Sequence, residues 1–201
     1  VGATDDQGIV KDVQKDGVKA VVTNKNHNTG TDRIFEAYQK LGIKDVDYIL
    51  NLQGDEPDIN KNDIINLNNF MINHDAALGT LAAKIHDDKM LNNKNVVKVI
   101  TKNNLDEKNF PLALNFTRNN LSESYQNIYH HIGVYAYKVN TLEKFVGLAQ
   151  TENEIENKLE QLRALENEIK INVALAKSSP IGVDTEEDYL AIKKIMEYKL
   201  Q

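Results

Sequence analysis

The sequence predicts an α/β protein with a doubly wound, mostly parallel sheet. Short apolar runs alternate with stretches in which apolar residues recur every three or four positions, which is typical of β-α-β units. The mainly apolar run from Val46 to Leu50 lacks regular polar alternation, so it indicates a strand covered by helices on both faces. No repeat, linker or low-complexity segment divides the chain, and we expect a single domain over residues 1–201.

The first half predicts strands and helices in alternation. Asp5 or Asp6 can cap a first helix, which Gly17 ends. The segment 29–33 opens the next helix, which Gly42 ends. The expected order is a strand that ends in the loop at residues 1–6, a helix to about residue 14, a strand at 19–23, a helix at 29–42, a strand at 46–50, a helix around 64–71 and a strand at 76–85.

The second half is less regular. Asn140, with Glu143 in the capping-box position, predicts one helix start, and Thr185 with Asp188 predicts another. The apolar spacing over residues 155–165 predicts a helix between these two. The remaining expected strands cover residues 96–101, 112–116, 132–137 and 171–176.

Composition argues against several kinds of partner. The chain has 24 Lys and Arg against 30 Asp and Glu, and this net charge of −6 argues against a protein that binds nucleic acid by neutralising phosphates. It has no cysteine, which excludes disulfides and thiolate metal sites and fits a cytoplasmic protein. No apolar run approaches the length of a membrane span. We therefore expect neither nucleic acid nor a membrane as a partner.

The loop after the strand at 46–50 carries the strongest chemical signal. Residues 51–57 read Asn-Leu-Gln-Gly-Asp-Glu-Pro. Open α/β sheets bind their ligands at the carboxyl ends of the strands, which is where this loop begins. Gly54 permits close approach of a ligand, and Asp55 and Glu56 offer the oxygen ligands that Mg²⁺ prefers. The competing interpretation is an acidic turn without a ligand.

A second acidic segment, residues 182–188, reads Gly-Val-Asp-Thr-Glu-Glu-Asp. Asp184 stands between the last expected strand and the last helix, so it could face Asp55 across the carboxyl edge of the sheet. Two carboxylates from separate loops are the usual minimum for holding Mg²⁺ against a triphosphate. The alternative is that Asp184 or Thr185 only caps the last helix.

Three further segments could bind a substrate, and each has a purely structural alternative. The helix start at 29–33 could present backbone N–H groups to an anion, although such sequences are common caps. His131 and Tyr135 share one face of a strand, which suits a sugar pocket or a half-buried strand with satisfied polar tips. Glu160 and Gln161 could contact a ligand or form a solvated helix face.

Taken in order, these segments resemble the 3-deoxy-manno-octulosonate (KDO) cytidylyltransferase family, the CMP-KDO synthetases of lipopolysaccharide assembly. The resemblance covers the whole chain at near-constant spacing. Gln-Gly-Asp-Glu-Pro together with Gly-Val-Asp-Thr is quite specific within the sugar cytidylyltransferases. The matching motifs are residues 3–6 (Ala-Thr-Asp-Asp), 27–33 (His-Asn-Thr-Gly-Thr-Asp-Arg), 53–57, 115–118 (Asn-Phe-Thr-Arg), 131–135 (His-Ile-Gly-Val-Tyr), 159–163 (Leu-Glu-Gln-Leu-Arg) and 182–188.

The resemblance implies a nucleotide-diphospho-sugar transferase fold with a smaller sugar-binding and dimerisation subregion, usually in a homodimer. It implies transfer of CMP from CTP to the anomeric hydroxyl of KDO, with release of pyrophosphate. By the same resemblance, Asp55 and Asp184 are the catalytic residues and hold Mg²⁺. This is chemically sensible because the metal neutralises charge on the triphosphate.

The resemblance also implies substrate contacts. Arg118 is the candidate for the sugar carboxylate, because a guanidinium fork matches that group. The other implied sugar contacts are Gln53, His131, Tyr135, Glu160 and Gln161. Gly30, Thr31 and Arg33 would lie near the nucleotide.

The chain departs from the family pattern in two places. The family's opening strand and its phosphate loop rich in Arg, Gly and Lys do not precede Val1, so we expect an N-terminal truncation and no turnover of CTP by these 201 residues alone. After Arg118 the family usually continues with Ile-Pro and a stretch containing Trp, whereas residues 119–122 read Asn-Asn-Leu-Ser. Two alternative functions stay open: a nucleotidyltransferase for another acidic sugar such as sialic acid, or a non-catalytic nucleotide-binding remnant.

Overall fold

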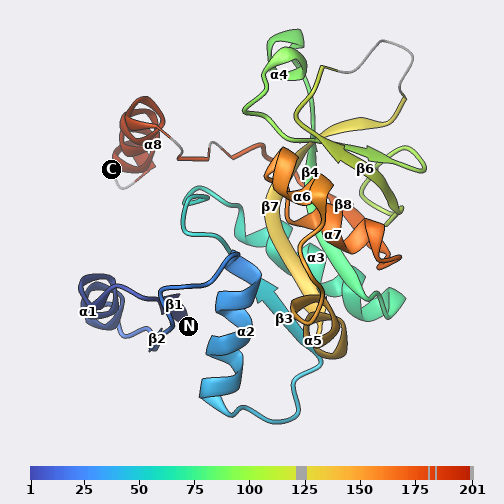
Figure 1. Ribbon diagram of the computed structural model, residues 1–201. Coiled ribbons are helices and arrows are strands. Elements are labelled where there is room, and N and C mark those ends of the chain that lie inside the picture. Colours follow the sequence, from blue (N-terminus) through green and yellow to red (C-terminus); the bar gives the residue numbers. More distant parts are fainter. Residues whose placement is uncertain (121–125, 181, 184, 200–201) are drawn as a thin grey trace.

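The computed structural model describes residues 1–120, 126–180, 182–183 and 185–199 (Figure 1). The strands are β1 (Gly2–Thr4), β2 (Ala20–Val22), β3 (Tyr48–Asn51), β4 (Leu78–Lys84), β5 (Lys98–Thr101), β6 (Ala113–Thr117), β7 (Ile128–Lys138) and β8 (Ile171–Leu175). The helices are α1 (Gln7–Lys15), α2 (Gly30–Leu41), α3 (Lys61–His74), α4 (Asp88–Asn92), α5 (Val139–Val146), α6 (Glu152–Asn157), α7 (Gln161–Glu166) and α8 (Glu186–Lys199).

A six-stranded sheet forms the centre of the molecule (Figure 1). Five of its strands follow the order β6-β5-β7-β4-β8, and the sixth, β3, pairs with β7. The long strand β7 pairs with β4 along one edge, and on its other edge with β5 near its start and β3 near its end. β1 and β2 form a separate parallel pair. The expected α/β class with a central sheet is confirmed. The sheet itself is mixed, because β4 and β8 are parallel whereas β7 runs antiparallel to β3, β4 and β5.

Helices cover both faces of this sheet. On one face, Leu67 and Met71 of α3 pack with Ile132 of β7. On the other face, Phe145 of α5 and Leu162 of α7 belong to the second cluster of buried side chains. Burying one such side chain contributes about 1.5–3 kcal/mol, so the two clusters fix the position of β7, the strand that carries several predicted site residues. Among the described residues, no helix combines the length and the apolarity needed to cross a bilayer.

Local side-chain chemistry explains where three helices begin or end. The Asp6 carboxylate accepts hydrogen bonds from the N–H groups of Gly8 and Ile9, which confirms the predicted cap of α1. Gly42 ends α2 in the left-handed conformation at φ 58°, as expected for a glycine C-cap. Thr185 and Asp188 form the predicted capping box, because Thr185 Oγ1 accepts from Asp188 N at 3.2 Å and Asp188 Oδ2 accepts from Thr185 N at 3.0 Å.

The predicted capping box at Asn140 and Glu143 is wrong. Helix α5 begins at Val139, directly after β7, and its cap residue Lys138 makes no side-chain capping bond. The N–H of Lys138 donates to the carbonyl of Ala77 at 2.9 Å, and the N–H of Val139 donates to Asp47 O at 3.1 Å. These two backbone bonds fix the helix start from the sheet, so no capping side chain is needed.

The single helix expected over residues 155–165 is two helices. α6 ends at Asn157, its C-cap Lys158 adopts the left-handed conformation at φ 53°, and α7 begins at Gln161. A true capping box starts α6, where Thr151 and Glu154 bond each other's backbone N–H groups. The break at Lys158 places Glu160 and Gln161 at the start of a new helix instead of in the middle of one.

Candidate active site

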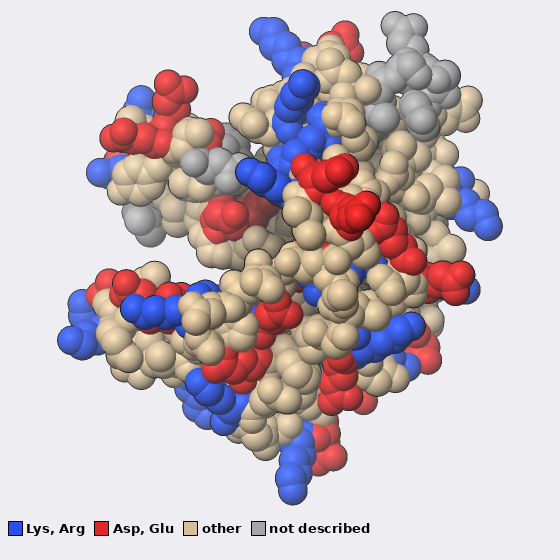
Figure 2. Space-filling view, viewed as in Figure 1, with Lys and Arg blue, Asp and Glu red and all other residues tan. Residues whose placement is uncertain are grey.

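A cavity of about 660 Å³ opens beside the six-stranded sheet, within the usual range for small-molecule sites. Figure 2 shows the hollow, with both acidic and basic side chains gathered around it. The predicted site residues that line the cavity are Gly30, Gln53, Asp55, Arg118, His131, Tyr135, Glu160 and Gln161. The structure therefore brings together residues that the sequence spreads over more than half of the chain.

Two of the described predicted site residues, Thr31 and Arg33, are not among those that line the cavity. Asp184 lies outside the described residues. Thr31 is buried, and its hydroxyl lies 3.2 Å from the hydroxyl of Tyr137. Arg33 pairs with the Asp5 carboxylate at 2.8 Å. The expected contacts of Thr31 and Arg33 with a nucleotide stay predictions.

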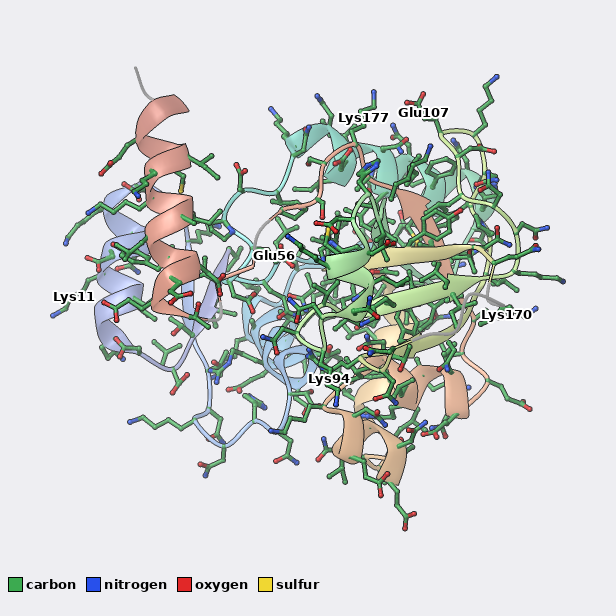
Figure 3. All side chains as sticks on the ribbon, turned by 90° about the horizontal axis from the view of Figure 1, so that it is seen from above. Lys11, Glu56, Lys94, Glu107, Lys170 and Lys177 are labelled. Atoms are coloured by element: carbon green, nitrogen blue, oxygen red, sulfur yellow. The ribbon has the colours of Figure 1, made fainter. Side chains whose placement is uncertain are left out.

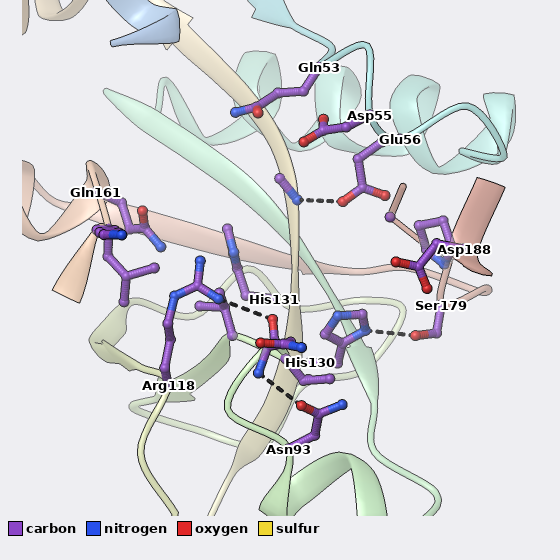
Figure 4. A pocket seen from close by; sticks show the side chains of 18 of the residues that line it. Gln53, Asp55, Glu56, Asn93, Arg118, His130, His131, Gln161, Ser179 and Asp188 are labelled. Atoms are coloured by element: carbon purple, nitrogen blue, oxygen red, sulfur yellow. Dashed lines mark hydrogen bonds between the residues drawn. The ribbon is translucent and has the colours of Figure 1, made fainter. Parts of the chain in front are cut away.

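The loop between β3 and α3 supplies one wall of the cavity (Figure 4). The N–H of Glu56 donates to Gln53 O at 3.2 Å, which closes a tight turn. The N–H of Gly133 on β7 donates to Glu56 Oε1 at 3.4 Å, so the loop docks on the sheet through this carboxylate. Asp55 stays exposed at the cavity, where its carboxylate can bind a cation.

The segment between β8 and α8 closes the same side. It is held at its start by Asp63, a buried residue of α3 whose carboxylate accepts from the N–H of Lys177 at 3.1 Å. Further along, the N–H of Val183 donates to the backbone carbonyl of Asp55 at 2.8 Å. The two acidic segments singled out from the sequence thus meet at residues 55 and 183. Seen from above, Glu56 lies between the sheet and the side of the molecule that carries α1 and α8 (Figure 3).

Arg118 lines the opposite wall, and the buried Lys98 supports the loop beside it. Arg118 follows β6 and lines the cavity, and its Nη1 donates to Asn95 O at 3.1 Å. Lys98 on β5 is fully buried, and its Nζ donates to the carbonyls of Asn93, Val96 and Arg118 at 2.9, 3.0 and 3.1 Å. Burial and the nearby Arg118 charge lower the pKa of Lys98. The two side chains together hold the loop at residues 93–97 against the cavity.

Two neighbouring histidines complete this wall. His130 Nδ1 lies 2.7 Å from Ser179 Oγ, which links β7 to the segment before α8. Burial lowers the pKa of His130, and the charge of Lys98 lowers it further. His131 is 7% exposed, and burial, with smaller contributions from His130 and Arg118, lowers its pKa to about 3. Both imidazoles are therefore mainly neutral near pH 7.

The start of α7 supplies a hydrogen-bond acceptor. Burial raises the pKa of Glu160, although the neighbouring hydroxyls of Thr31 and Thr29 oppose this shift. Its Oε1 atom has no hydrogen-bond partner among the described residues. Gln161 follows it on the cavity wall and is 7% exposed. A carboxylate oxygen with unused acceptor capacity beside an amide suits a ligand that carries hydroxyl groups.

A buried ion pair supports the break between α6 and α7. Arg163 and Glu154 are 2% and 3% exposed, and two bonds join them, Nε to Oε2 at 2.8 Å and Nη2 to Oε1 at 2.5 Å. The guanidinium also lies 4.6 Å from the centre of the Phe145 ring. This pair clamps α7 to α6 and α5, which positions Glu160 and Gln161 at the cavity.

Some residues of the cavity carry no signal in the sequence. Asn93, Asn95 and Val96 line it from a polar loop that has no motif of its own. His130, next to the predicted His131, lines the cavity as well, and no role was assigned to it from the sequence. Ser179 lines the cavity from the segment that Asp63 anchors. These residues reach the site through tertiary contacts, which a local pattern does not reveal.

The fold and the cavity define an α/β protein that binds a small molecule carrying both negative charge and hydroxyl groups. One wall carries carboxylates suited to a cation, and the other carries a guanidinium and two neutral imidazoles. Such a polarised cavity at a sheet edge is typical of enzymes that act on phosphorylated or acidic metabolites.

Comparison with known proteins gives the family. A family model described as cytidylyltransferase matches residues 1–171. A relative from Thermodesulfovibrio yellowstonii, named 3-deoxy-manno-octulosonate cytidylyltransferase, is 39% identical over 96% of this chain and 80% of its own length. A relative of the same name from Bartonella bacilliformis is also 39% identical, over 96% of this chain and 79% of its own. The chain belongs to the cytidylyltransferase family, among relatives named 3-deoxy-manno-octulosonate cytidylyltransferase.

Solved structures agree with the fold. A CMP:2-keto-3-deoxy-manno-octonic acid synthetase complexed with CTP superimposes with a TM-score of 0.86 at 29% identity, over 98% of this chain and 80% of that one. A 4-diphosphocytidyl-2C-methyl-D-erythritol synthase from Anaerococcus prevotii superimposes with a TM-score of 0.60 at 16% identity, over 96% and 78% of the two chains. The second likeness shows the fold alone.

Proposed function

We propose that this protein transfers CMP from CTP to the anomeric hydroxyl of KDO, which yields CMP-KDO and pyrophosphate for lipopolysaccharide biosynthesis. The names of the relatives at 39% identity support the reaction and both substrates, as does the 29%-identical structure complexed with CTP. The observation that carries the proposal is the convergence of Gln53, Asp55, Arg118, His131 and Glu160 on one cavity.

Within this proposal, Asp55 and Asp184 hold a catalytic Mg²⁺. The donors fit the ion, because carboxylate oxygens are its preferred protein ligands and the Val183 N–H bond to Asp55 O joins the two loops. Among the described residues, which exclude Asp184, no three His, Cys, Asp or Glu side chains gather as a metal site. Two carboxylates suffice when phosphate oxygens and water complete the octahedron. When bound, Mg²⁺ neutralises charge on the triphosphate and favours ionisation of the attacking hydroxyl.

The protein's own side chains bind and orient the sugar. Arg118 receives the carboxylate of KDO, because its guanidinium lines the wall opposite the acidic loop. The hydroxyls of KDO contact His131, Tyr135, Glu160 and Gln161, with Gln53 between sugar and nucleotide and Gly30 near the nucleotide. Held in this way, the anomeric oxygen forms a bond to the α-phosphorus of CTP, and the bond from that phosphorus to pyrophosphate breaks.

The proposal also includes a cytoplasmic homodimer. The family resemblance supports the dimer, and the absence of cysteine fits a reducing compartment. Sedimentation at several concentrations of the protein measures its mass directly, and a monomer at micromolar concentration contradicts this part of the proposal.

A substrate exchange experiment tests the function. The enzyme expressed from the complete gene is assayed for pyrophosphate release with CTP or UTP and with KDO or sialic acid, in all four combinations with Mg²⁺. Release should be strong only with CTP and KDO. Pyrophosphate release only with sialic acid would contradict KDO as the substrate and leave the fold assignment unaffected. No release with any of the four pairs would favour a non-catalytic remnant.

A further inference from the structure

Thr80 lies beneath the cavity at the point where β7 is irregular. It is fully buried on β4, and its pairing with Tyr135 is followed by the pairing of Leu81 with Ile132, so β7 carries two extra residues here. Its hydroxyl oxygen lies 2.8 Å from Val134 O, 3.3 Å from Ile132 O and 3.1 Å from His131 Nε2. A single hydroxyl thus meets two backbone carbonyls and one imidazole nitrogen.

The donor and acceptor roles in this cluster have one consistent solution. A hydroxyl has one proton, and a carbonyl can only accept, so the proton of Thr80 is directed at the carbonyls, with Val134 O the nearer. Toward His131 the oxygen then presents a lone pair, and Nε2 must carry the hydrogen. In the opposite tautomer, Nε2 carries only a lone pair. The single proton of Thr80 could then be directed at the carbonyls or at Nε2, and the remaining contact would bring two lone pairs together with no proton between them.

The charge state of His131 completes the assignment. Burial lowers its pKa to about 3, and the charges of His130 and Arg118 act in the same direction. The ring is therefore neutral near pH 7 and carries a single N–H. With that hydrogen on Nε2, the Nδ1 atom is a pure acceptor. The structure records no hydrogen bond between Nδ1 and the described residues, and His131 lines the cavity.

We propose that Thr80 is a positioning residue that holds His131 in the Nε2–H tautomer, so that Nδ1 accepts a hydrogen bond from a hydroxyl of the bound sugar. The identity of that sugar rests on the proposed function. An acceptor at this position selects for a hydroxyl and against a carboxylate or phosphate oxygen, which would bring two lone pairs together. Thr80 thereby directs the acidic group of the sugar to Arg118 without touching the substrate itself.

Nitrogen-15 NMR of the histidine rings tests the tautomer without any substrate. In the unmodified enzyme, the His131 signals, identified by their loss in His131→Gln, should show a protonated Nε2 and an unprotonated Nδ1. Thr80→Val removes the hydroxyl at nearly constant shape and should populate the Nδ1–H form, whereas Thr80→Ser should retain the original form. A protonated Nδ1 in the unmodified enzyme overturns the proposal even if Thr80→Val does not fold, and so does a Thr80→Val spectrum like that of the unmodified enzyme.

Steady-state kinetics tests the consequence for binding. Thr80→Val should raise the KM for KDO by about tenfold, the effect of losing one hydrogen bond to the substrate. The KM for CTP should stay unchanged, and Thr80→Ser should restore the KM for KDO. A lower kcat with both KM values unchanged would show a merely structural role and overturn the proposal. If the unmodified enzyme does not use KDO, the proposed function fails, and the NMR result still decides the role of Thr80.

Discussion

At the residue scale, burial sets the chemical state of the side chains that face the cavity. It keeps His131 neutral and raises the pKa of Glu160, and the guanidinium of Arg118 lines the same cavity. The same wall can therefore offer an acceptor, a cation and a carboxylate to different parts of one ligand. Glu160 lowers the stability of the folded protein in this arrangement, because its charged form is buried and its Oε1 lacks a partner among the described residues.

Replacing Glu160 by Gln should stabilise the protein and impair sugar binding. The folded-state pKa of Glu160 is raised, which means that folding favours the protonated carboxyl group. The stability that this group contributes is therefore fully present below its unfolded-state pKa, and it is lost as the pH rises through its folded-state pKa. Glu160→Gln should therefore raise Tm at pH 7 by on the order of a few degrees, and by less at pH 4. Thermal unfolding at both pH values checks this, with the exposed Glu152→Gln as control. A lower Tm at pH 7 would contradict it.

At the scale of elements, the break between α6 and α7 presents Glu160 and Gln161 to the cavity. The bidentate pair of Arg163 with Glu154 is buried and holds the break in place. Removal of one partner of a buried pair leaves an uncompensated charge, which costs more than the intact pair contributes. The stability of this element therefore depends on both side chains being present.

Arg163→Met should lower the free energy of unfolding by about 3–5 kcal/mol. The matched control is Lys15→Met, because Lys15 pairs with Asp12 where both side chains are more than 70% exposed, and an exposed pair is worth about 1 kcal/mol or less. Urea denaturation of both variants measures the difference. Equal losses in the two variants would show that the buried pair does not hold the element.

The sequence predicted those elements whose boundaries depend on local chemistry. The caps at Asp6 and Gly42 and the box of Thr185 with Asp188 follow from side chains within a few residues. The break at Lys158 was not predictable, because a lysine in the left-handed conformation has no local signal, and the buried pair of Arg163 with Glu154 that packs α7 against α6 is a tertiary contact. For the same reason, the cap expected at Asn140 failed where the sheet fixed the helix start.

At the scale of the whole molecule, the mixed sheet explains why the site could be predicted only in part. Motifs that stand at or next to strand ends met at one cavity, although the strands that carry them do not all run in the same direction. Lys98 holds the loop at residues 93–97 beside these motifs, because its buried ammonium group donates to three backbone carbonyls. Nothing within that loop indicates this role, because the information lies on β5 and after β6.

The two walls of the cavity have opposite roles in the proposed function. In that proposal, the acidic wall, with Asp55 and the segment that reaches Val183, would face the metal and the triphosphate, and the wall with Arg118 would face the sugar acid. We propose that Asp55 and Asp184 act as one metal-binding pair although the chain separates them widely.

Mg²⁺-dependent pyrophosphate release from CTP and KDO tests this claim most directly, measured for Asp55→Asn, Asp184→Asn and the double variant of the enzyme expressed from the complete gene. The exposed Asp12→Asn on α1 is the matched control. Each single change should reduce kcat by on the order of 100-fold or more and weaken the dependence on Mg²⁺, and the double variant should lose little further. Full activity with unchanged Mg²⁺ dependence in either single variant would contradict the account.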